Sequence, residues 1–152
     1  MKILMVCLGN ICRSPMAHGL MEEKIKQHQL AWQVDSAGTS AYHQGEAPDV
    51  RARSCMKKHH IDICNQQSRP FLKKDFEEFD LIFCMDKMNF RDVLSYTKSE
   101  VDKQKVKLIL HEIDDELEEE VPDPYYGGEY GFENVYQMLD KATDAIIQHY
   151  SK

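Results

Sequence analysis

The chain has 152 residues, and at the usual ~150 residues per domain this length predicts one domain over residues 1–152. Hydrophobic residues make up 42% of it and charged residues 30%, a balance typical of a folded globular protein rather than a disordered one. The net charge of −7 argues against nucleic acid or an anionic membrane as the main partner, because both attract a basic face.

The five cysteines are an odd number and include no Cys-x-x-Cys pair. A disulfide framework is therefore not expected, and free thiols in a reducing cytosol are favoured. Without a Cys-x-x-Cys or His-x3-His pair we expect no metal site and no cofactor. The apolar run at 3–8 is shorter than the ~7–15 residues of a signal peptide, and no segment approaches the ~20 apolar residues of a membrane span. These features predict a cytoplasmic location.

Short apolar runs alternate with helix-period segments along the chain, which is the pattern of βαβ units. In chain order we expect a strand at 3–7, a helix opening at Ser14-Pro15, a strand at 32–36, helices at 49–60 and 73–79, a strand at 81–85, a helix at 89–96, a strand at 106–110 and a last helix. The last helix is marked by apolar residues at helical spacing: Val135, Leu139, Ala142, Ile146 and Tyr150. The predicted fold is α/β, a three-layer sandwich with a four-stranded, mainly parallel twisted sheet.

The segment after the first strand, residues 7–14 with the sequence CLGNICRS, is the first candidate site. Ligands of such sheets bind beyond the carboxyl ends of the strands, at a switch in strand order. The amides of a helix N-terminus, with a loop curled over them, form a cradle for an anion. Gly9 allows positive φ and close backbone approach, and Asn10 tolerates left-handed geometry. Arg13 adds a planar fork that can hold two phosphate oxygens.

Cys7 lies at the end of the strand and faces this cradle. The positive field there should stabilise a thiolate, and Ser14 can donate a hydrogen bond to the sulfur. The pattern thus favours an ionised nucleophile under a bound tetrahedral anion. The alternative is a packing residue at a strand end, since a Cys-x5-Arg spacing also arises by chance.

Residues 7–14, with Met5-Val6 before them and Pro15-Met16-Ala17 after them, resemble the signature of low-molecular-weight protein tyrosine phosphatases. The segments 34–39 (VDSAGT), 83–86 (FCMD) and 123–127 (DPYYG) stand where that family has its matching blocks, so the resemblance covers nearly the whole chain. It implies a phosphoric monoester hydrolase whose phosphatase loop follows the first strand. Such an enzyme hydrolyses phosphotyrosine and small aryl phosphates through a covalent phosphocysteine, without metal.

The resemblance also implies roles for individual residues. The catalytic residues would be Cys7, Arg13 and Asp123. Asp123, between two prolines, would be the general acid and then the base; the alternative is a turn residue. Phosphate binding and loop support would fall to Leu8, Gly9, Asn10, Ile11, Cys12, Ser14 and Ser36. The pocket walls would be Tyr42, Tyr125 and Tyr126.

Three further positions carry expectations with alternatives. Asp86 would pair with Arg13 or the loop amides, or else cap a turn. Cys12 would pair with Cys7 under oxidation and make the enzyme redox-sensitive, or else be a small buried loop residue. In the segment 65–70 (NQQSRP) an Asn or Gln replaces a His that the family often carries. Because Gln can still form hydrogen bonds, we expect retained activity.

The implied partners are phosphotyrosine-containing proteins, a tyrosine kinase among them. Two other functions remain open. An arsenate reductase would begin with the same attack, but it needs two further cysteines close together after the middle of the chain, where only Cys84 lies. A non-catalytic anion binder would keep Arg13 but could lose Cys7 or Asp123, and both are present. The stretch 112–120, with seven carboxylates among nine residues, is either a solvated rim or a feature that steers basic phosphopeptides.

Overall fold

The computed structural model describes residues 1–127 and 131–152 in full and residues 129–130 by their backbone. The strands of its sheet are β1 (Lys2–Cys7), β2 (Gln33–Gly38), β3 (Leu81–Cys84) and β4 (Val106–Leu108). Within the described residues they form a four-stranded sheet in the order β2-β1-β3-β4, with every pair parallel. The predicted α/β class is confirmed, and the sheet is wholly parallel rather than mainly so.

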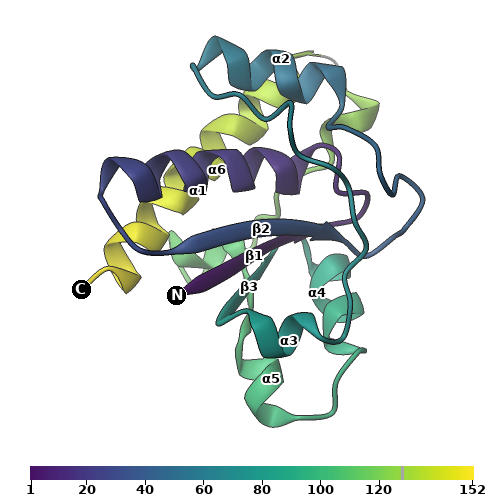
Figure 1. Ribbon diagram of the computed structural model, residues 1–152, viewed down its shortest axis with the longest axis vertical. Helices are drawn as coiled ribbons and strands as arrows, with labels where there is room; N and C mark the ends of the chain where they lie inside the picture. Colours follow the sequence, from purple (N-terminus) through teal and green to yellow (C-terminus); the bar gives the residue numbers. More distant parts are fainter. Residues whose placement is uncertain (128) are drawn as a thin grey trace.

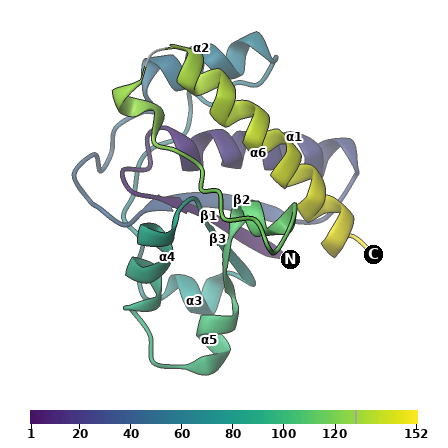
Figure 2. The same ribbon diagram turned by 180° about the vertical axis from the view of Figure 1, so that it is seen from behind.

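Helices cover both faces of this sheet, which confirms the three-layer arrangement (Figures 1 and 2). On one side lie α1 (Arg13–Gln27) and α6 (Glu129–Tyr150), with α2 (Val50–Lys58) packed against both. On the other side lie α3 (Asp75–Glu78), α4 (Lys87–Leu94) and α5 (Glu100–Gln104). Among the described residues, no helix has both the length and the hydropathy that a membrane span needs.

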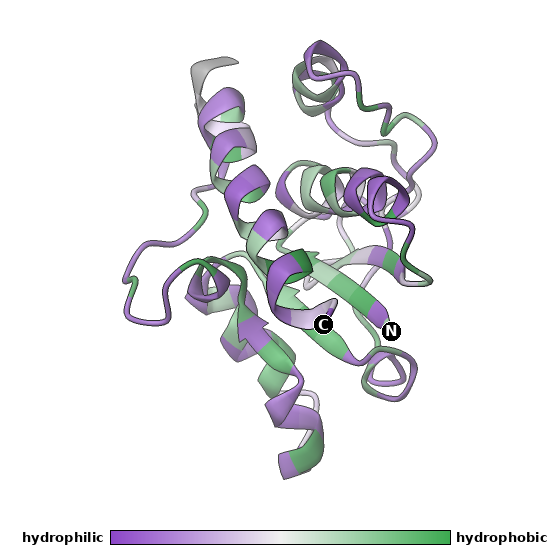
Figure 3. Ribbon diagram, turned by 90° about the vertical axis from the view of Figure 1, so that its left-hand side faces the viewer, coloured by the Kyte–Doolittle hydropathy of each residue, from purple (hydrophilic) through white to green (hydrophobic). Residues whose placement is uncertain are grey.

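The side chains of β1 alternate between two cores, as the two-residue period of a strand requires. Ile3 and Met5 pack toward α1 and α6, whereas Leu4 and Val6 pack toward α3 and α4; all four are fully buried. Each such burial contributes about 1.5–3 kcal/mol to stability. Figure 3 shows the result by hydropathy, with hydrophobic residues concentrated in the strands between the helical layers. The segment that follows β1 therefore starts from a strand that is buried on both faces.

The boundaries of several elements differ from the predicted ones. The helix α1 begins at Arg13, so Pro15 is its third residue, where the first-turn amide that proline lacks has no helical partner anyway. The strand β4 ends two residues early, because Ile109–Glu112 turns into the 3-10 helix η1. The five-residue α5 was not predicted; Ser99 caps it by accepting a hydrogen bond from the amide of Asp102 at 3.3 Å.

The strand order places β1 between β2 and β3, so the chain leaves β1 to one side and later returns on the other. The loop after β1 therefore lies at a switch in strand order, beyond the carboxyl ends of the strands, which is where the sequence predicts a ligand site.

Candidate active site

The loop between β1 and α1 holds its shape through one left-handed residue and close packing on the end of β2. Asn10 has φ 55°, as predicted for a residue that tolerates this region. Gly9 does not use a positive φ; a side chain there would instead bring a Cβ within 3.1 Å of His43 Cδ2. At Gly38 a Cβ would lie 2.8 Å from the carbonyl oxygen of Leu8, so the absence of a side chain lets the loop approach β2.

The sulfur of Cys7 is buried and receives two polar contacts. The amide of Asn10 donates to Sγ at 3.3 Å, and the hydroxyl of Ser14 lies 3.0 Å from it. The side-chain amide of Asn10 donates to the same hydroxyl oxygen at 2.7 Å, which leaves the hydroxyl hydrogen to point at the sulfur. Two donors therefore converge on the sulfur of Cys7.

The N-terminus of α1 lies where the sequence predicts an anion cradle. Cys12 occupies the N-cap position, and no described side chain caps this helix end. The amides of the first turn therefore stay open to an anion, with the partial positive charge of the helix behind them.

The guanidinium of Arg13 is buried and held from behind. Its Nη1 donates to Asp86 Oδ2 at 2.7 Å and to the carbonyl of Val121 at 3.0 Å. Burial alone would lower the pKa of Arg13, but the nearby Cys7, Asp86 and Asp123 together raise it. The guanidinium thus remains charged inside the protein.

Asp86 performs both of the tasks that the sequence left as alternatives. Its Oδ2 accepts from Arg13, while its Oδ1 accepts from the amide of Asn89 at 2.8 Å and caps α4. One carboxylate therefore fixes the orientation of the guanidinium relative to a helix end.

Asp123 likewise combines a turn role with a position at the site. Its Oδ1 accepts from the amide of Tyr125 at 3.0 Å and caps the 3-10 helix η2 (Pro124–Tyr126). Its Oδ2 lies 3.8 Å from Arg13 Nη2, and the side chain is 35% exposed. The carboxyl group is thus anchored through one oxygen and faces the arginine with the other.

A cavity of about 480 Å³ joins these groups. The residues that line it are Cys7, Leu8, Gly9, Ile11, Cys12, Arg13, Ser40, Tyr42, His43, Asp123, Tyr125 and Tyr126. Ser40 and His43 were not predicted; they come from the loop after β2, whose irregular sequence gives no positional signal. The predicted residues Asn10, Ser14 and Ser36 do not line the cavity and lie behind the loop.

Those three residues form one hydrogen-bonded group. The side-chain amide of Asn10 donates to Ser36 Oγ at 3.0 Å as well as to Ser14, and its Oδ1 accepts from the backbone amide of Arg69 at 3.0 Å. The hydroxyl of Ser68 donates to the carbonyl of Gly9 at 3.1 Å. The loop is therefore held from the side opposite the cavity.

Gln66, which with Asn65 was a candidate for the position of the usual His, does not join this group. Its side-chain amide donates to the carbonyl of Pro15 at 3.1 Å, and its Oε1 is buried without a partner among the described residues. Instead His18, on α1, places Nδ1 3.4 Å from Ser36 Oγ and Nε2 3.0 Å from Glu22 Oε2. The four-residue spacing of Ser14, His18 and Glu22 on one helix face was the signal that could have revealed this link.

Arg51 supports the mouth of the cavity and was also missed. Its guanidinium lies 5.3 Å from the ring centre of Tyr125 and 4.9 Å from that of Phe132. Its Nη1 donates to the carbonyl of Gly127 at 3.2 Å, and its Nε donates to Asp49 at 3.1 Å. These contacts hold Tyr125 at the cavity, whereas Tyr126 is 89% exposed.

The chain matches the low molecular weight phosphotyrosine protein phosphatase family over residues 2–152. The low molecular weight phosphotyrosine protein phosphatase of Homo sapiens is 40% identical over 150 residues, which cover 97% of this chain and 94% of the human protein. The crystal structure of a protein tyrosine phosphatase from Entamoeba histolytica, with Hepes in the active site, is 41% identical with a TM-score of 0.93, covering 99% of this chain and 97% of that one. The structure of a Drosophila arginine phosphatase is 31% identical with a TM-score of 0.92, covering 100% and 99%. The chain therefore belongs to the low molecular weight phosphotyrosine protein phosphatase family and is an enzyme of that family.

Proposed function

We propose that the chain, as one domain over residues 1–152, hydrolyses phosphotyrosine and small aryl phosphates through a covalent phosphocysteine at Cys7. The observation that supports this most is the single cavity lined by the Cys7 sulfur, the Arg13 guanidinium and the Asp123 carboxyl. The Oδ2 of Asp123 lies 3.8 Å from the guanidinium, and an uncapped helix N-terminus adjoins them.

In the first step the Cys7 thiolate attacks phosphorus. The S–P bond forms while the bond from phosphorus to the ester oxygen breaks, and its electron pair leaves with that oxygen. Asp123 gives its proton to the leaving oxygen. Arg13 and the loop amides hold the three equatorial phosphoryl oxygens, the main electrostatic demand of phosphoryl transfer.

In the second step water attacks the phosphocysteine. Asp123, now a carboxylate, takes a proton from the water as the O–P bond forms. The S–P bond breaks and its electron pair returns to the Cys7 sulfur, where Ser14 and the amide of Asn10 stabilise the thiolate. Inorganic phosphate leaves and Asp123 is again protonated for the next cycle.

The walls of the cavity support an aryl phosphate as substrate. Three tyrosines, Tyr42, Tyr125 and Tyr126, line the cavity together with the apolar side chains of Leu8 and Ile11. Apolar and aromatic walls favour a flat ring and give the cavity depth. Phosphotyrosine can then reach the cradle, whereas the shorter phosphoserine falls short. Phosphotyrosine proteins, with a tyrosine kinase among them, would be the partners in a cytoplasmic setting.

A phosphoarginine substrate is the alternative that one structural neighbour raises. A guanidinium leaving group would need anionic partners, and Asp123 is the only carboxylate among the described lining residues. We therefore expect kcat/KM to be far higher for a phosphotyrosine peptide than for the matched phosphoarginine peptide. The reverse order would reassign the substrate while leaving the fold and family intact.

A thiol-based arsenate reductase and a non-catalytic binder are less well supported. Cys84 packs in the core between the sheet and α4, and burial raises the pKa of its thiol. It is therefore not placed to exchange disulfides. A pure binder would need neither Cys7 nor Asp123 beside Arg13.

Cys12 supports a redox response of the same site. Peroxide would oxidise the Cys7 thiolate to sulfenic acid, and the Cys12 thiol would then displace water from it to form a disulfide. Both residues line one cavity. We propose that this disulfide protects Cys7 reversibly, with a thiol reductant restoring activity.

Hydrolysis of an aryl phosphate tests the catalytic assignment. Cys7→Ser should abolish turnover while phosphate binding survives. The matched change Cys64→Ser, at an exposed thiol, should leave turnover intact. Asp123→Asn keeps the helix cap but removes the proton, so kcat should fall by about 10²–10⁴-fold and most for poor leaving groups. Chelators should leave kcat unchanged. Full turnover by Cys7→Ser would refute the phosphocysteine.

A further inference from the structure

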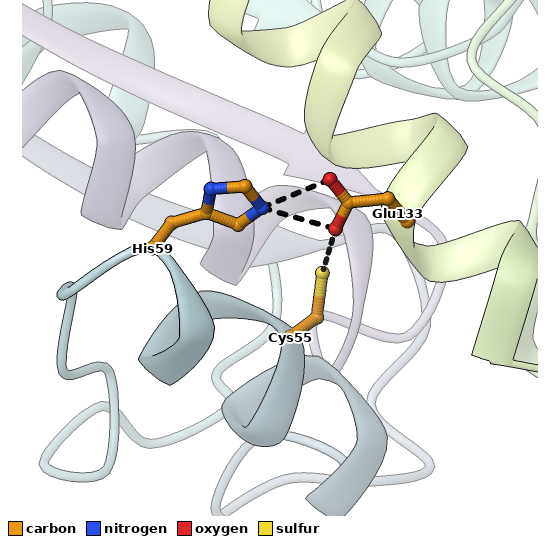
Figure 4. A group of neighbouring side chains, drawn as sticks. All are labelled: Cys55, His59 and Glu133. Atoms are coloured by element: carbon orange, nitrogen blue, oxygen red, sulfur yellow. Dashed lines mark hydrogen bonds and ion pairs between the residues drawn. The ribbon is translucent and has the colours of Figure 1, made fainter.

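Three side chains of metal-binding type converge outside the active site. Cys55 on α2, His59 directly after it and Glu133 on α6 point toward one another, with their ligand atoms all within 4.8 Å (Figure 4). Cys55 is buried, and the other two are partly exposed. None of the three lines the active-site cavity.

The placement of these residues follows from the helices. Cys55 and His59 are four residues apart, so they lie one above the other on the face of α2 that packs against α6. Glu133 reaches them from α6. The spacing Cys-x3-His is itself that of a chelating pair, although it is neither a Cys-x-x-Cys nor a His-x3-His unit.

The distances between the ligand atoms are close to those that a tetrahedral ion needs. His59 Nε2 lies 2.9 Å and 3.0 Å from the two carboxylate oxygens of Glu133, and Cys55 Sγ lies 3.5 Å from Oε2. Around a tetrahedral zinc the corresponding separations are about 3.3–3.6 Å, from Zn–N and Zn–O bonds of ~2.0–2.1 Å and a Zn–S bond of ~2.3 Å. The pairs with Glu133 need a change of at most a few tenths of an ångström, and Cys55 Sγ lies within 4.8 Å of the His59 ligand nitrogen.

Neighbouring side chains hold the ligands in orientation. The imidazole of His59 stacks on the ring of Tyr136, with centroids 3.6 Å apart and planes at 8°. The side-chain amide of Gln137 donates to Glu133 Oε1 at 2.9 Å. Such outer contacts fix ligand geometry at metal sites. A cavity of about 220 Å³ along Cys55 and Glu133 gives an entry path and room for a water as the fourth ligand.

We propose that Cys55, His59 and Glu133 bind a divalent zinc-type ion that clamps α2 to α6. One sulfur, one imidazole nitrogen and one carboxylate suit Zn²⁺ or Co²⁺ better than Mg²⁺ or Ca²⁺, which prefer oxygen alone. Binding releases the Cys55 thiol proton to solvent, and the ring proton of His59 leaves Nε2 for Nδ1 or for solvent. Thiolate and carboxylate then neutralise the two charges of the ion.

Two cationic side chains, Arg51 and Lys58, line the cavity beside Cys55, and neither opposes the binding of a cation there. Arg51 is paired with Asp49, and Lys58 favours the thiolate form of Cys55. Burial and Glu133 raise the pKa of Cys55 to about 11, so the residue is a thiol until an ion displaces its proton. The clamp adjoins the active site through α2, because Arg51 in its first turn contacts Tyr125 at the cavity mouth.

Cobalt titration of the full chain, with a non-thiol reductant present, tests the site directly. The background is Cys7→Ser, which removes the competing active-site thiolate. We expect one Co²⁺ per chain, with the d–d bands of a tetrahedral ion and a sulfur-to-cobalt charge-transfer band. The band should disappear with Cys55→Ser and persist with Cys64→Ser. No charge-transfer band, or one that survives Cys55→Ser, would overturn the proposal.

The rise in Tm on Zn²⁺ binding is a second measurement of the site. It requires neither enzyme activity nor a folded Cys55 variant. Zn²⁺ at a hundredfold excess over its Kd should raise Tm of the Cys7→Ser background by about 5–10 °C. His59→Gln and Glu133→Gln, at partly exposed positions, should each remove most of that rise, whereas His28→Gln on the helix α1 end should not. If Tm rises equally in the Cys7→Ser background and in its three variants, the ion binds elsewhere and the clamp is refuted.

Discussion

At the scale of single residues, two cysteines share one loop but have opposite surroundings. The sulfur of Cys7 receives the amide of Asn10 and the hydroxyl of Ser14. Burial raises the pKa of the Cys12 thiol, and the negative charges of Asp49 and Cys7 raise it further. The loop therefore directs two donors at one sulfur and keeps the other, only five residues away, as a protonated thiol. This difference fits the proposed roles, in which Cys7 attacks phosphorus and Cys12 reacts only after Cys7 has been oxidised.

Alkylation should report this difference. A raised pKa keeps Cys12 protonated through the neutral range and into mildly alkaline solution, so iodoacetamide at pH 7 should modify Cys7 and spare Cys12. Peptide mapping by mass spectrometry measures both sites, and the exposed Cys64 serves as the internal comparison. Inorganic phosphate should protect Cys7 but not Cys64. Modification of Cys12 at a rate similar to Cys7 at pH 7 would contradict this assignment.

His18 is a positioning residue in the same network, since it reaches the sulfur only through Ser36, Asn10 and Ser14. Its contact with Ser36 is long, so we expect His18→Leu to lower kcat by only about 2–10-fold, the worth of one hydrogen bond. His18→Gln keeps a polar end and should restore part of the loss. Steady-state kinetics with an aryl phosphate measure both, and KM should change less than kcat. If His18→Leu and His18→Gln have the same kcat, the polar contact of His18 does not support catalysis.

At the scale of elements, the sequence predicted best what local patterns determine. The apolar run of β1, the loop after it and the start of α1 follow from neighbouring residues, and the structure brings them together as expected. The links made by Asp86, His18 and Arg51 depend on which elements become neighbours. The strand order that brings Asp86 to Arg13 across 73 residues has no local signal. The C-terminal end of β4 and the short α5 were missed because tertiary contacts and a single cap decide them.

Gly19 shows how packing can override helix propensity. Replacing this glycine in α1 by alanine would gain about 1 kcal/mol of propensity. The new Cβ would lie 2.5 Å from Ile63 Cγ2 in a filled core, and overpacking costs about 1–3 kcal/mol. We expect Gly19→Ala to lower Tm by about 2–4 °C, whereas Lys26→Ala, exposed on the same helix, should leave it unchanged.

A double-mutant cycle isolates the cause of this loss. In an Ile63→Ala background the clash is gone, so Gly19→Ala should become neutral or stabilising in thermal unfolding. If Gly19→Ala raises Tm in the wild-type background, the helix and the segment around Ile63 are less tightly packed than the structure indicates.

At the scale of the whole molecule, the charge of −7 is unevenly distributed. Six carboxylates in the segment 113–120 are exposed, and the segment leads directly to Val121 and Asp123 at the active site. One of these charges is paired nearby, where the Lys87 ammonium lies 3.2 Å from Glu118, and Glu120 accepts a hydrogen bond from the backbone amide of Lys87. Because the Debye length at physiological salt is about 8 Å, exposed charges can act on the part of a bound peptide that passes near this segment. The acidic segment 113–120 is exposed, as a solvated rim would be. Whether it also steers charged peptides can be measured.

The salt dependence of kcat/KM should therefore depend on the charge around the phosphotyrosine. For a peptide flanked by lysines we expect kcat/KM to fall as salt rises, and for one flanked by glutamates to rise, since screening removes attraction in the first case and repulsion in the second. Glu116→Gln with Glu119→Gln should narrow the difference between the peptides. Glu77→Gln with Glu78→Gln changes the net charge equally, but those residues precede β3, at the end of the sheet opposite the site, so this pair should leave the difference intact. Equal effects of the two double variants would mean that only the net charge matters and that the acidic segment has no directional role.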